Sequence, residues 1–404
     1  MITTINNKHN KLNVPNLRFK EFQGEWKEER MADIADLYKG TGISKDQLSD
    51  DGEPCILYGE LYTKYKSETI REVISKTNID NTKLVRSKAN DIIIPCSGET
   101  AEDIATARCV LNGNILLGGD LNIIRLHGYD GAFMSYQLNG RRKYDIAKVA
   151  QGVSVVHLYG EHLKGVKTIN PCLEEQKKIA SLLALLDERI ATQNKIIDKL
   201  QSLIKGINQR VFMNNGINYK LGEVCEIRSG YSGNQLLSKK GLKVSRIETI
   251  SGHKVNLERV GYVAPFESSE NYKLQVGDIL FSNINSVEYI GNTAFIDKDY
   301  NLYHGMNLLR LTPNNMVVIP FYLYLLLNTN RMLNRFKTVC NKAVSQASIN
   351  QTELGKTVVQ IPDINAQKQI CELYQALYDK LESEKYANSL FQKQKQYLLR
   401  QMFI

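Results

Sequence analysis

The sequence is poor in the patterns that build disulfide frameworks and zinc sites. Its 404 residues contain seven cysteines, an odd number, and no two of them have CxxC spacing. The six histidines are scattered, and none lies beside a cysteine or a carboxylate at ligand spacing. The cysteines are therefore expected to be small buried side chains in a reducing compartment, and no metal site is predicted.

Long hydrophobic runs are also missing. The longest apolar stretches, Ile179 to Leu186 and Phe321 to Leu327, are far shorter than the roughly 18 residues that a membrane-spanning helix needs. The first residues, Met1 to Lys11, are polar and rich in asparagine, without the apolar segment of a signal peptide. These absences predict a cytoplasmic protein that does not contact a membrane.

The motifs of common catalytic sites are absent as well. There is no GxxxxGK[ST] phosphate loop, no GxSxG nucleophile elbow and no FxGxG loop for S-adenosylmethionine. No Pro-Pro dipeptide occurs, which excludes the Asx-Pro-Pro-aromatic motif of amino-methyltransferases. Glu175 and Lys177 have the Glu-x-Lys spacing of a nuclease metal site, but an acid that complements a helix dipole is the simpler interpretation. No catalytic residue is predicted.

The charge balance favours a polyanionic partner. The formal net charge is +9 and the isoelectric point is about 9.0, which indicates nucleic acid and counts against an acidic DNA mimic. A hydrophobic content of 43% and a charged content of 24% are typical of a globular protein. At roughly 150 residues per domain, the length predicts two or three domains.

The chain contains an internal repeat. Met31 to Leu37 resembles Leu221 to Ile227, and Gly40 matches Gly230. Further matched pairs follow in the same order, at offsets between 185 and 191 residues: Asp91-Ile-Ile-Ile-Pro with Asp278-Ile-Leu-Phe-Ser, Leu121–Leu126 with Met306–Leu311, Ile169–Pro171 with Gln360–Pro362, and Gln176–Ile179 with Gln367–Ile370. So steady an offset indicates a duplication.

Each copy of the repeat is expected to be a mixed α+β unit followed by a long helix. Short runs of Ile, Val, Leu and Tyr alternate with turn-forming clusters, and the Asp-Ile-Ile-Ile and Asp-Ile-Leu-Phe runs indicate buried strands. The predicted domains are 1–170 (N-terminal segment and first globular unit), 171–215 (first helix), 216–361 (second unit) and 362–404 (second helix).

Heptad spacing of apolar residues after Pro171 and Pro362 predicts that the two helices pair as an antiparallel coiled coil with pseudo-two-fold symmetry. At ~1.5 Å per residue such helices are about 50 Å long, the scale of a spacer between two DNA half-sites. The second helix has a weaker seam, interrupted by Glu384, Asn388 and Lys395. The predicted seam residues are Ile179, Leu183, Leu186, Ile190, Ile197, Leu200, Ile204, Ile370, Leu377, Leu381 and Leu398.

Polar loops with different residues on a matching framework are the candidate DNA contacts, because Asn, Gln, Arg, Ser and Thr read base edges while Lys and Tyr suit phosphate contact and base packing. Taken singly, each of these residues is also an ordinary turn former. In the first unit the candidates are Lys39, Thr41, Lys45, Tyr58, Tyr62, Lys64, Tyr65, Lys66, Ser97, Glu99, Gln151 and Ser154. In the second unit they are Arg228, Tyr231, Ser232, Asn234, Arg246, Asn283, Asn285, Lys342, Ser345 and Gln346.

Four features together resemble the specificity subunit of type I restriction–modification enzymes. The first two are the tandem plan of unit and helix and the segment from Pro15 to Trp26 before the first unit. The other two are the Asp-Ile-Leu-like strand and the proline that is followed by Glu175 to Ile179 ahead of the long helix. The resemblance covers nearly the whole chain. It implies two target recognition domains, each reading one half of a split DNA site, and a two-helix spacer.

The same resemblance implies partners that carry the chemistry. Two modification subunits would bring S-adenosylmethionine and methylate adenine N6, and restriction subunits would bring ATP, Mg and cleavage for host defence. This chain would then be non-catalytic and would need no cofactor. Two alternatives stay open: a self-contained methyltransferase or nuclease, and a coiled-coil scaffold whose globular ends bind proteins.

Overall fold

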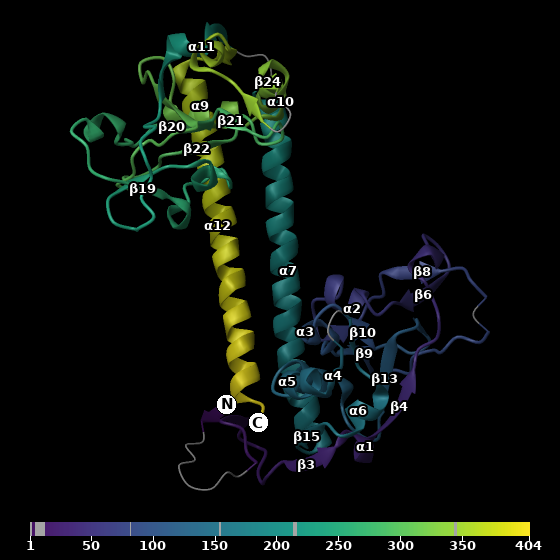
Figure 1. The fold of residues 1–404 in the computed structure, drawn as a ribbon. Helices are drawn as coiled ribbons and strands as arrows, with labels where there is room; N and C mark the ends of the chain where they lie inside the picture. The colour runs from purple at the N-terminus through teal and green to yellow at the C-terminus, as the bar shows by residue number, and fades with distance from the viewer. Residues whose placement is uncertain (1, 5–12, 81, 153–154, 213–215, 343–345) are drawn as a thin grey trace. The chain divides into compact units, whose positions relative to one another are not determined.

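The computed structural model describes residues 2–4, 13–80, 82–152, 155–212, 216–342 and 346–404. Two compact units are present: Met1–Lys195 with Lys385–Ile404, and Ile196–Glu384. The boundaries between them fall inside two long helices, α7 (Leu173–Val211) and α12 (Ile364–Gln401) (Figure 1). Each unit therefore contains one globular part and a segment of both long helices. The domain boundaries expected from the sequence stay a proposal.

The first unit is built around a five-stranded sheet in the order β4-β13-β9-β11-β7. All neighbours are antiparallel except β11 and β7. The side chains of the central strand β9 are buried along its whole length, as expected for the Asp-Ile-Ile-Ile run. The strands of this sheet are β4 (Ala35–Lys39), β13 (Leu121–Leu126), β9 (Asp91–Pro95), β11 (Arg108–Val110) and β7 (Thr69–Ile70).

Helices cover one face of this sheet. Ile92 and Ile94 of β9 point to α4 (Gly131–Asn139) and α5 (Lys143–Val149), while Ile93 points to a second cluster on the opposite face. This alternation follows from the two-residue period of a strand. The other elements of the unit are β1 (Ile2–Thr4), β2 (Leu17–Phe19), β3 (Lys27–Arg30), α1 (Met31–Ile34), β5 (Leu48–Ser49), β6 (Glu53–Ile56), α2 (Glu60–Thr63), β8 (Ser75–Thr77), β10 (Ser97–Gly98), α3 (Ala101–Ile104), β12 (Leu116–Leu117), β14 (Val156–His157), α6 (Gly160–Lys164) and β15 (Lys167–Asn170).

The second unit repeats this plan in a smaller sheet, in the order β17-β23-β20-β22. Helices α9 and α10 pack on one face of it, and an apolar cluster with Leu280 and Leu308 lies on the other. Its elements are β16 (Ile217–Lys220), α8 (Leu221–Val224), β17 (Cys225–Ser229), β18 (Leu242–Val244), β19 (Gly261–Val263), β20 (Ile279–Ser282), β21 (Ile284–Asn285), β22 (Thr293–Phe295), β23 (Leu308–Pro313), α9 (Pro320–Leu327), α10 (Asn330–Val339), β24 (Asn341–Lys342), β25 (Ala347–Ser348), α11 (Gln351–Gly355) and β26 (Val358–Ile361).

Strand pairing corrects one part of the repeat alignment. In the first unit Ile92 pairs with Ile124, and in the second unit Ile279 pairs with Leu311. Because Asp91 matches Asp278, Ile92 matches Ile279, and Ile124 must match Leu311. The strand Leu121–Leu126 therefore corresponds to Leu308–Pro313, two residues beyond the match predicted from the sequence.

Side-chain contacts support the corrected register. Arg125 donates from Nε and Nη2 to Asp91, at 2.9 and 2.7 Å. At the corrected position Thr312 donates from Oγ1 to Asp278, at 2.6 Å. A shift of two residues leaves every side chain on the same face of the strand, so the apolar pattern could not detect the error.

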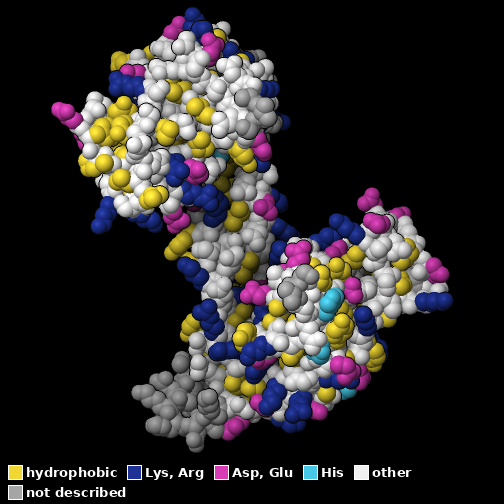
Figure 2. Space-filling model, viewed as in Figure 1, with side chains coloured by type: hydrophobic (Ala, Val, Ile, Leu, Met, Phe, Trp, Pro, Cys, Tyr) yellow, Lys and Arg dark blue, Asp and Glu magenta, His cyan; other side chains and the backbone are white. Residues whose placement is uncertain are grey.

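The described surface is mixed in charge. On the face drawn in Figure 2, Lys and Arg side chains are interspersed with Asp and Glu on both units. The basic surplus therefore does not by itself locate a DNA-binding surface. Among the described residues, no helix combines the length and the apolar character that crossing a membrane requires.

Within each unit the two long helices pack antiparallel. In the first unit Leu183 and Leu186, early in α7, cluster with Leu398, late in α12, and with Met402, which directly follows α12. In the second unit late residues of α7 cluster with early residues of α12. The predicted seam residues in these clusters are Ile179, Leu183, Leu186, Leu398, Ile197, Leu200, Ile204, Ile370, Leu377 and Leu381. Ile190 is half-buried outside them.

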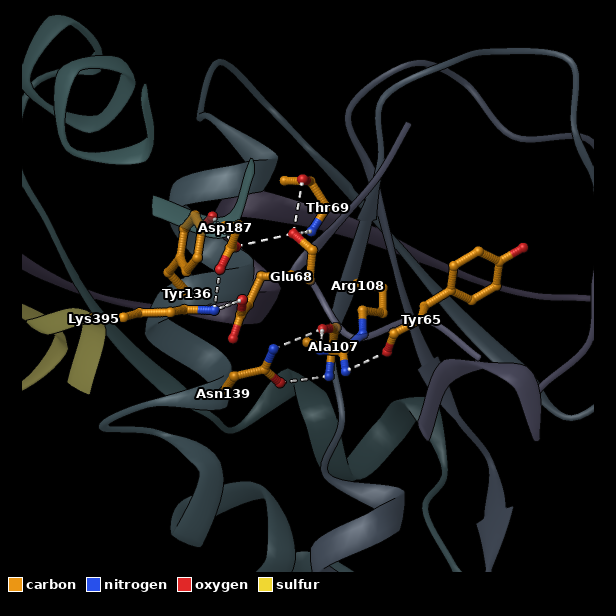
Figure 3. A network of polar contacts seen from close by, with 10 residues as sticks. Tyr65, Glu68, Thr69, Ala107, Arg108, Tyr136, Asn139, Asp187 and Lys395 are labelled. Atoms are coloured by element: carbon orange, nitrogen blue, oxygen red, sulfur yellow. Dashed lines mark hydrogen bonds and ion pairs between the residues drawn. The ribbon is translucent and has the colours of Figure 1, made fainter. Parts of the chain in front are cut away.

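The polar residues that interrupt the second seam have partners. Asn388 donates to Asn194 at 2.9 Å, and Glu384 forms an ion pair with Lys380. The ammonium group of Lys395 lies 2.5 Å from a carboxylate oxygen of Glu68 and 2.6 Å from one of Asp187 (Figure 3). Polar residues in such a seam fix helix register.

Candidate nucleic-acid interface

Three predicted contact residues of the first unit lie at one end of its five-stranded sheet. Lys39 ends β4 and pairs with Asn122 near the start of β13. Ser97 follows β9, whose last residue pairs with the first residue of β13. Ser97 pairs with His157, and Gln151 forms an isolated bridge with the same histidine. The fold thus brings together loops that are more than a hundred residues apart.

The remaining polar candidates of this unit differ in their exposure and partners. The hydroxyl group of Thr41 is half-buried and accepts a hydrogen bond from the Val85 N–H at 3.0 Å. Lys45 and Glu99 are exposed. Burial raises the pKa of Tyr62, and the nearby Tyr58, Asp103 and Glu99 raise it further.

One residue of the Tyr58–Lys66 segment, Tyr65, is corrected by the structure, and the partners of Lys64 are defined. Tyr65 is only 7% exposed, and its hydroxyl group accepts a hydrogen bond from the Ile74 N–H at 3.2 Å. Lys64 donates to Glu60 at 2.6 Å and to Ser75 at 2.9 Å. Tyr65 is thus a core residue, whereas Lys64 is exposed and its ammonium group forms an ion pair with Glu60.

The other residues of that segment stay available. Tyr58 and Tyr62 are half-buried, and Lys66 is exposed. The alternation of rings and cations gave no sign that Tyr65 faces the core, where it packs in a cluster with Ile56 and Leu61.

A small three-stranded sheet joins the corresponding loops of the second unit. Asn285 in β21 pairs with Ala347 in β25, which also pairs with Lys342 in β24. Asn283 lies just before β21 and donates to the Ile349 carbonyl at 3.3 Å. Exposed Gln346 precedes β25. Two candidates, Ser154 of the first unit and Ser345 of the second, lie outside the described residues.

The glycine-rich loop after β17 packs tightly on the chain before β23. The Tyr231 N–H donates to the His304 carbonyl at 2.9 Å. The Tyr231 ring stacks on Phe266, with 4.0 Å between the ring centroids, so the face of this ring is used in packing within the unit. Ser232 and Asn234 in the same loop are exposed. Arg246 is exposed as well and forms an ion pair with Glu248 at 3.7 Å.

Replacing Gly230 by alanine is expected to lower the free energy of unfolding by about 1–3 kcal/mol. An added Cβ would lie 1.8 Å from the Gly305 carbonyl oxygen, and at the matching Gly40 it would lie 2.0 Å from the Gly118 oxygen. Urea unfolding measures the loss. Gly252→Ala is the control, because nothing lies within 4 Å of its added Cβ. Equal stabilities of the two variants would contradict the expectation.

A polar pocket of about 330 Å³ lies beside this loop, lined by Arg228, His304 and Arg310 among others. His304 is buried, and its Nε2 lies 2.9 Å from the Leu308 carbonyl oxygen. Burial lowers the pKa of His304 to about 4, and the charge of Arg310 lowers it further against the effect of the Leu308 carbonyl. His304 is therefore neutral near pH 7 and donates from Nε2 to Leu308.

Arg310 and His304 were missed from the sequence. Arg310 interrupts the run Leu308-Leu309-Arg310-Leu311, which is a visible signal. The register error matched it with Arg125, whose partner is Asp91, and so hid its different environment. His304 carries no sequence signal, because its role depends on contacts with distant strands.

The Glu-x-Lys pattern has a structural explanation. Arg18 donates from Nε and Nη2 to the two carboxylate oxygens of Glu175, both at 2.8 Å, and both side chains are buried. Glu175 is therefore used to anchor the segment before the first unit. Among the described residues, no group of three or more His, Cys, Asp or Glu could hold a metal ion.

Comparison with known proteins agrees with this architecture. The 158-residue match with the type I restriction enzyme MjaX specificity subunit of Methanocaldococcus jannaschii is 42% identical and covers 38% of this chain and 37% of that protein. The MjaVIII specificity subunit of the same organism is 24% identical over 416 residues, 94% of each chain. The solved S subunit of a type I system from M. genitalium has a TM-score of 0.63 at 17% identity, over 97% of this chain and 99% of the other, and so shares the fold.

The family profile described as the type I restriction modification DNA specificity domain matches residues 23–202 and again residues 216–389. These two matches cover most of the chain and coincide with the two copies of the repeat. The chain therefore belongs to the family of type I restriction modification DNA specificity proteins, with one specificity domain in each copy of its repeat.

Proposed function

We propose that this specificity subunit reads a DNA site in two halves, one with each globular unit, and directs partner subunits to that site. The observation that carries the proposal is a repeated framework with different polar side chains at equivalent places. In the first unit Ser97 and Gln151 both pair with His157, whereas in the second unit Asn285 and Lys342 both pair with Ala347. Different base-reading groups on one scaffold suit two different short sequences.

The partners would supply the chemistry. Modification subunits would bring S-adenosylmethionine and methylate adenine, and restriction subunits would bring ATP and Mg. In this proposal the chain itself contributes no catalytic group. Its own residues would position the duplex, and the paired helices α7 and α12 would act as the spacer between the two reading units.

The test is to map methylated adenines genome-wide in cells that carry this subunit with its modification partners. We expect a bipartite motif of two short blocks separated by a fixed gap. Replacing residues 216–361 by the corresponding unit of another specificity subunit should change one block and leave the other intact. A continuous motif, or the loss of both blocks on exchange, would contradict the proposal.

Binding in vitro separates this function from a protein-binding scaffold. A DNA-reading chain should bind duplex with an affinity that falls steeply as salt increases, because phosphate contacts release counterions. The absence of any DNA binding with the modification subunits present would favour the scaffold. Methylation by the isolated chain would favour a self-contained enzyme.

A further inference from the structure

Two arginines face each other across neighbouring strands of the second unit. Arg228 in β17 and Arg310 in β23 are direct partners in the antiparallel register. Like charges at such positions destabilise a sheet. Arg228 is exposed and forms an ion pair with Glu226, but Arg310 is only 7% exposed. The uncompensated charge is therefore the buried one.

The guanidinium group of Arg310 is only partly satisfied. It donates from Nη1 to the Lys273 carbonyl and from Nη2 to the Asn271 carbonyl, both at 3.2 Å. Its buried Nε has no hydrogen-bond partner. No ion pair joins it to a carboxylate of any described residue. A buried charge without a counter-charge is costly, so an anion at this place would be stabilising.

The fold does not require an arginine here. In the corrected register Arg310 occupies the position of Ile123 in the first unit. Ile123 is fully buried in an apolar cluster with Ile56 and Leu117. The same strand position is thus filled by packing in one unit and by a cation in the other.

The surroundings of Arg310 suit an anion. The pocket of about 330 Å³ is lined by both arginines and by hydrogen-bonding side chains such as Ser229, Ser268 and Asn271. None of the described residues that line it is Asp or Glu. His304 is neutral and contributes no charge to the pocket. Arginine pairs of this kind give strong, charge-assisted hydrogen bonds to phosphate oxygens.

We propose that this pocket binds an oxyanion and that, in the DNA complex, the oxyanion is a backbone phosphate of the duplex. The identity of the phosphate source rests on the proposed function, whereas the oxyanion site itself does not. The second unit would then anchor the duplex backbone at a point where the first unit has the buried Ile123 in place of Arg310.

Thermal unfolding tests the oxyanion site without DNA. The full chain is melted in inorganic phosphate and in chloride of equal ionic strength, with Arg310→Met and Arg228→Met beside the unchanged protein. Phosphate should raise the melting temperature of the unchanged protein more than that of either variant. In chloride, Arg310→Met should be at least as stable as the unchanged protein, because it removes an uncompensated charge. An equal phosphate shift in all three proteins would overturn the proposal.

DNA binding identifies the source of the phosphate. Arg310→Met should weaken duplex binding about 10-fold or more and reduce the salt slope of log affinity by about 0.9 for one lost contact. Arg228→Met covers the case in which Arg310→Met does not fold. Arg335→Met, an exposed arginine on α10 bonded to the Val358 carbonyl, is the control and should leave both quantities unchanged.

The outcomes separate the two proposals. A phosphate shift with an unchanged salt slope would mean that the pocket takes a free oxyanion, and the DNA assignment would be wrong. If the unchanged chain with its modification subunits bound no DNA, the proposed function would fail, while the thermal comparison would still decide the oxyanion site.

Discussion

Lys395→Met is expected to lower the free energy of unfolding by about 3–5 kcal/mol, because it leaves two buried carboxylates without their cation. The ammonium group of Lys395 contacts Glu68 and Asp187, and the Asp187 carboxylate also accepts hydrogen bonds from Tyr136 at 2.7 Å and from Ser67 at 2.9 Å (Figure 3). Urea unfolding of the full chain measures the loss. Lys393→Met on the same helix is the control, because Lys393 is exposed.

In the other unit the two helices pack without a charged cluster at the positions equivalent to Asp187 and Lys395. With the offset of 191 residues between the long helices, Asp187 and Lys395 correspond to Tyr378 and Ile204, which lie in an apolar cluster with Leu325. The triple variant Glu68→Gln, Asp187→Asn, Lys395→Met should therefore recover part of the stability lost in Lys395→Met. If the triple variant were less stable than the single one, burial of uncompensated charge would not be the cause.

The penalty should also depend on pH. Burial raises the pKa of Glu68 above its ordinary value of 4.5, and Asp187 adds to the rise while Lys395 opposes it. A carboxyl group whose pKa is raised by folding costs stability as the pH rises from 4.5 through the folded pKa. Without Lys395 the pKa of Glu68 should rise further. The stability difference between Lys395→Met and the unchanged protein should then shrink as the pH is lowered from about 7 toward about 5.

Arg18→Leu is expected to cost a similar amount, about 3–5 kcal/mol, because Glu175 would be left buried and unpaired. Arg18 also donates to the Gly24 and Gln23 carbonyls, at 2.5 and 3.2 Å, and so ties the segment before the first unit together. Leu17, Phe19 and Trp26 of this segment pack on the long helices, so its release would expose their apolar cluster. Thermal unfolding and limited proteolysis measure the effect.

A double variant supplies the control for this pair. The second copy of the repeat has Ala366 where the first has Glu175, and only four residues separate Phe212 from Ile217, too few for a counterpart of the Pro15–Trp26 segment. Arg18→Leu with Glu175→Ala should therefore be more stable than Arg18→Leu alone, with a coupling energy above about 1 kcal/mol in a double-mutant cycle. Additive losses would show that the two side chains act independently.

The repeat and the long helices could be predicted from the sequence because they depend on local patterns. Heptad spacing in α7 and α12, the buried Asp-Ile-Ile-Ile and Asp-Ile-Leu-Phe strands and the glycines at 40 and 230 are each specified within a few residues. Both glycines lie where a neighbouring backbone leaves no room for a side chain. Such features need no knowledge of distant contacts.

The structure decided what depends on contacts between distant segments. Tyr65 lies in the core although its neighbours in sequence are polar, and the strand Leu121–Leu126 matches Leu308–Pro313 because pairing, not the apolar pattern, sets the register. The partners of Lys395, and the lack of a carboxylate partner for Arg310 among the described residues, could not be predicted for the same reason. A local pattern specifies which face of an element is buried, but a charge buried in that face is stabilised or left uncompensated by residues that only the tertiary fold brings near.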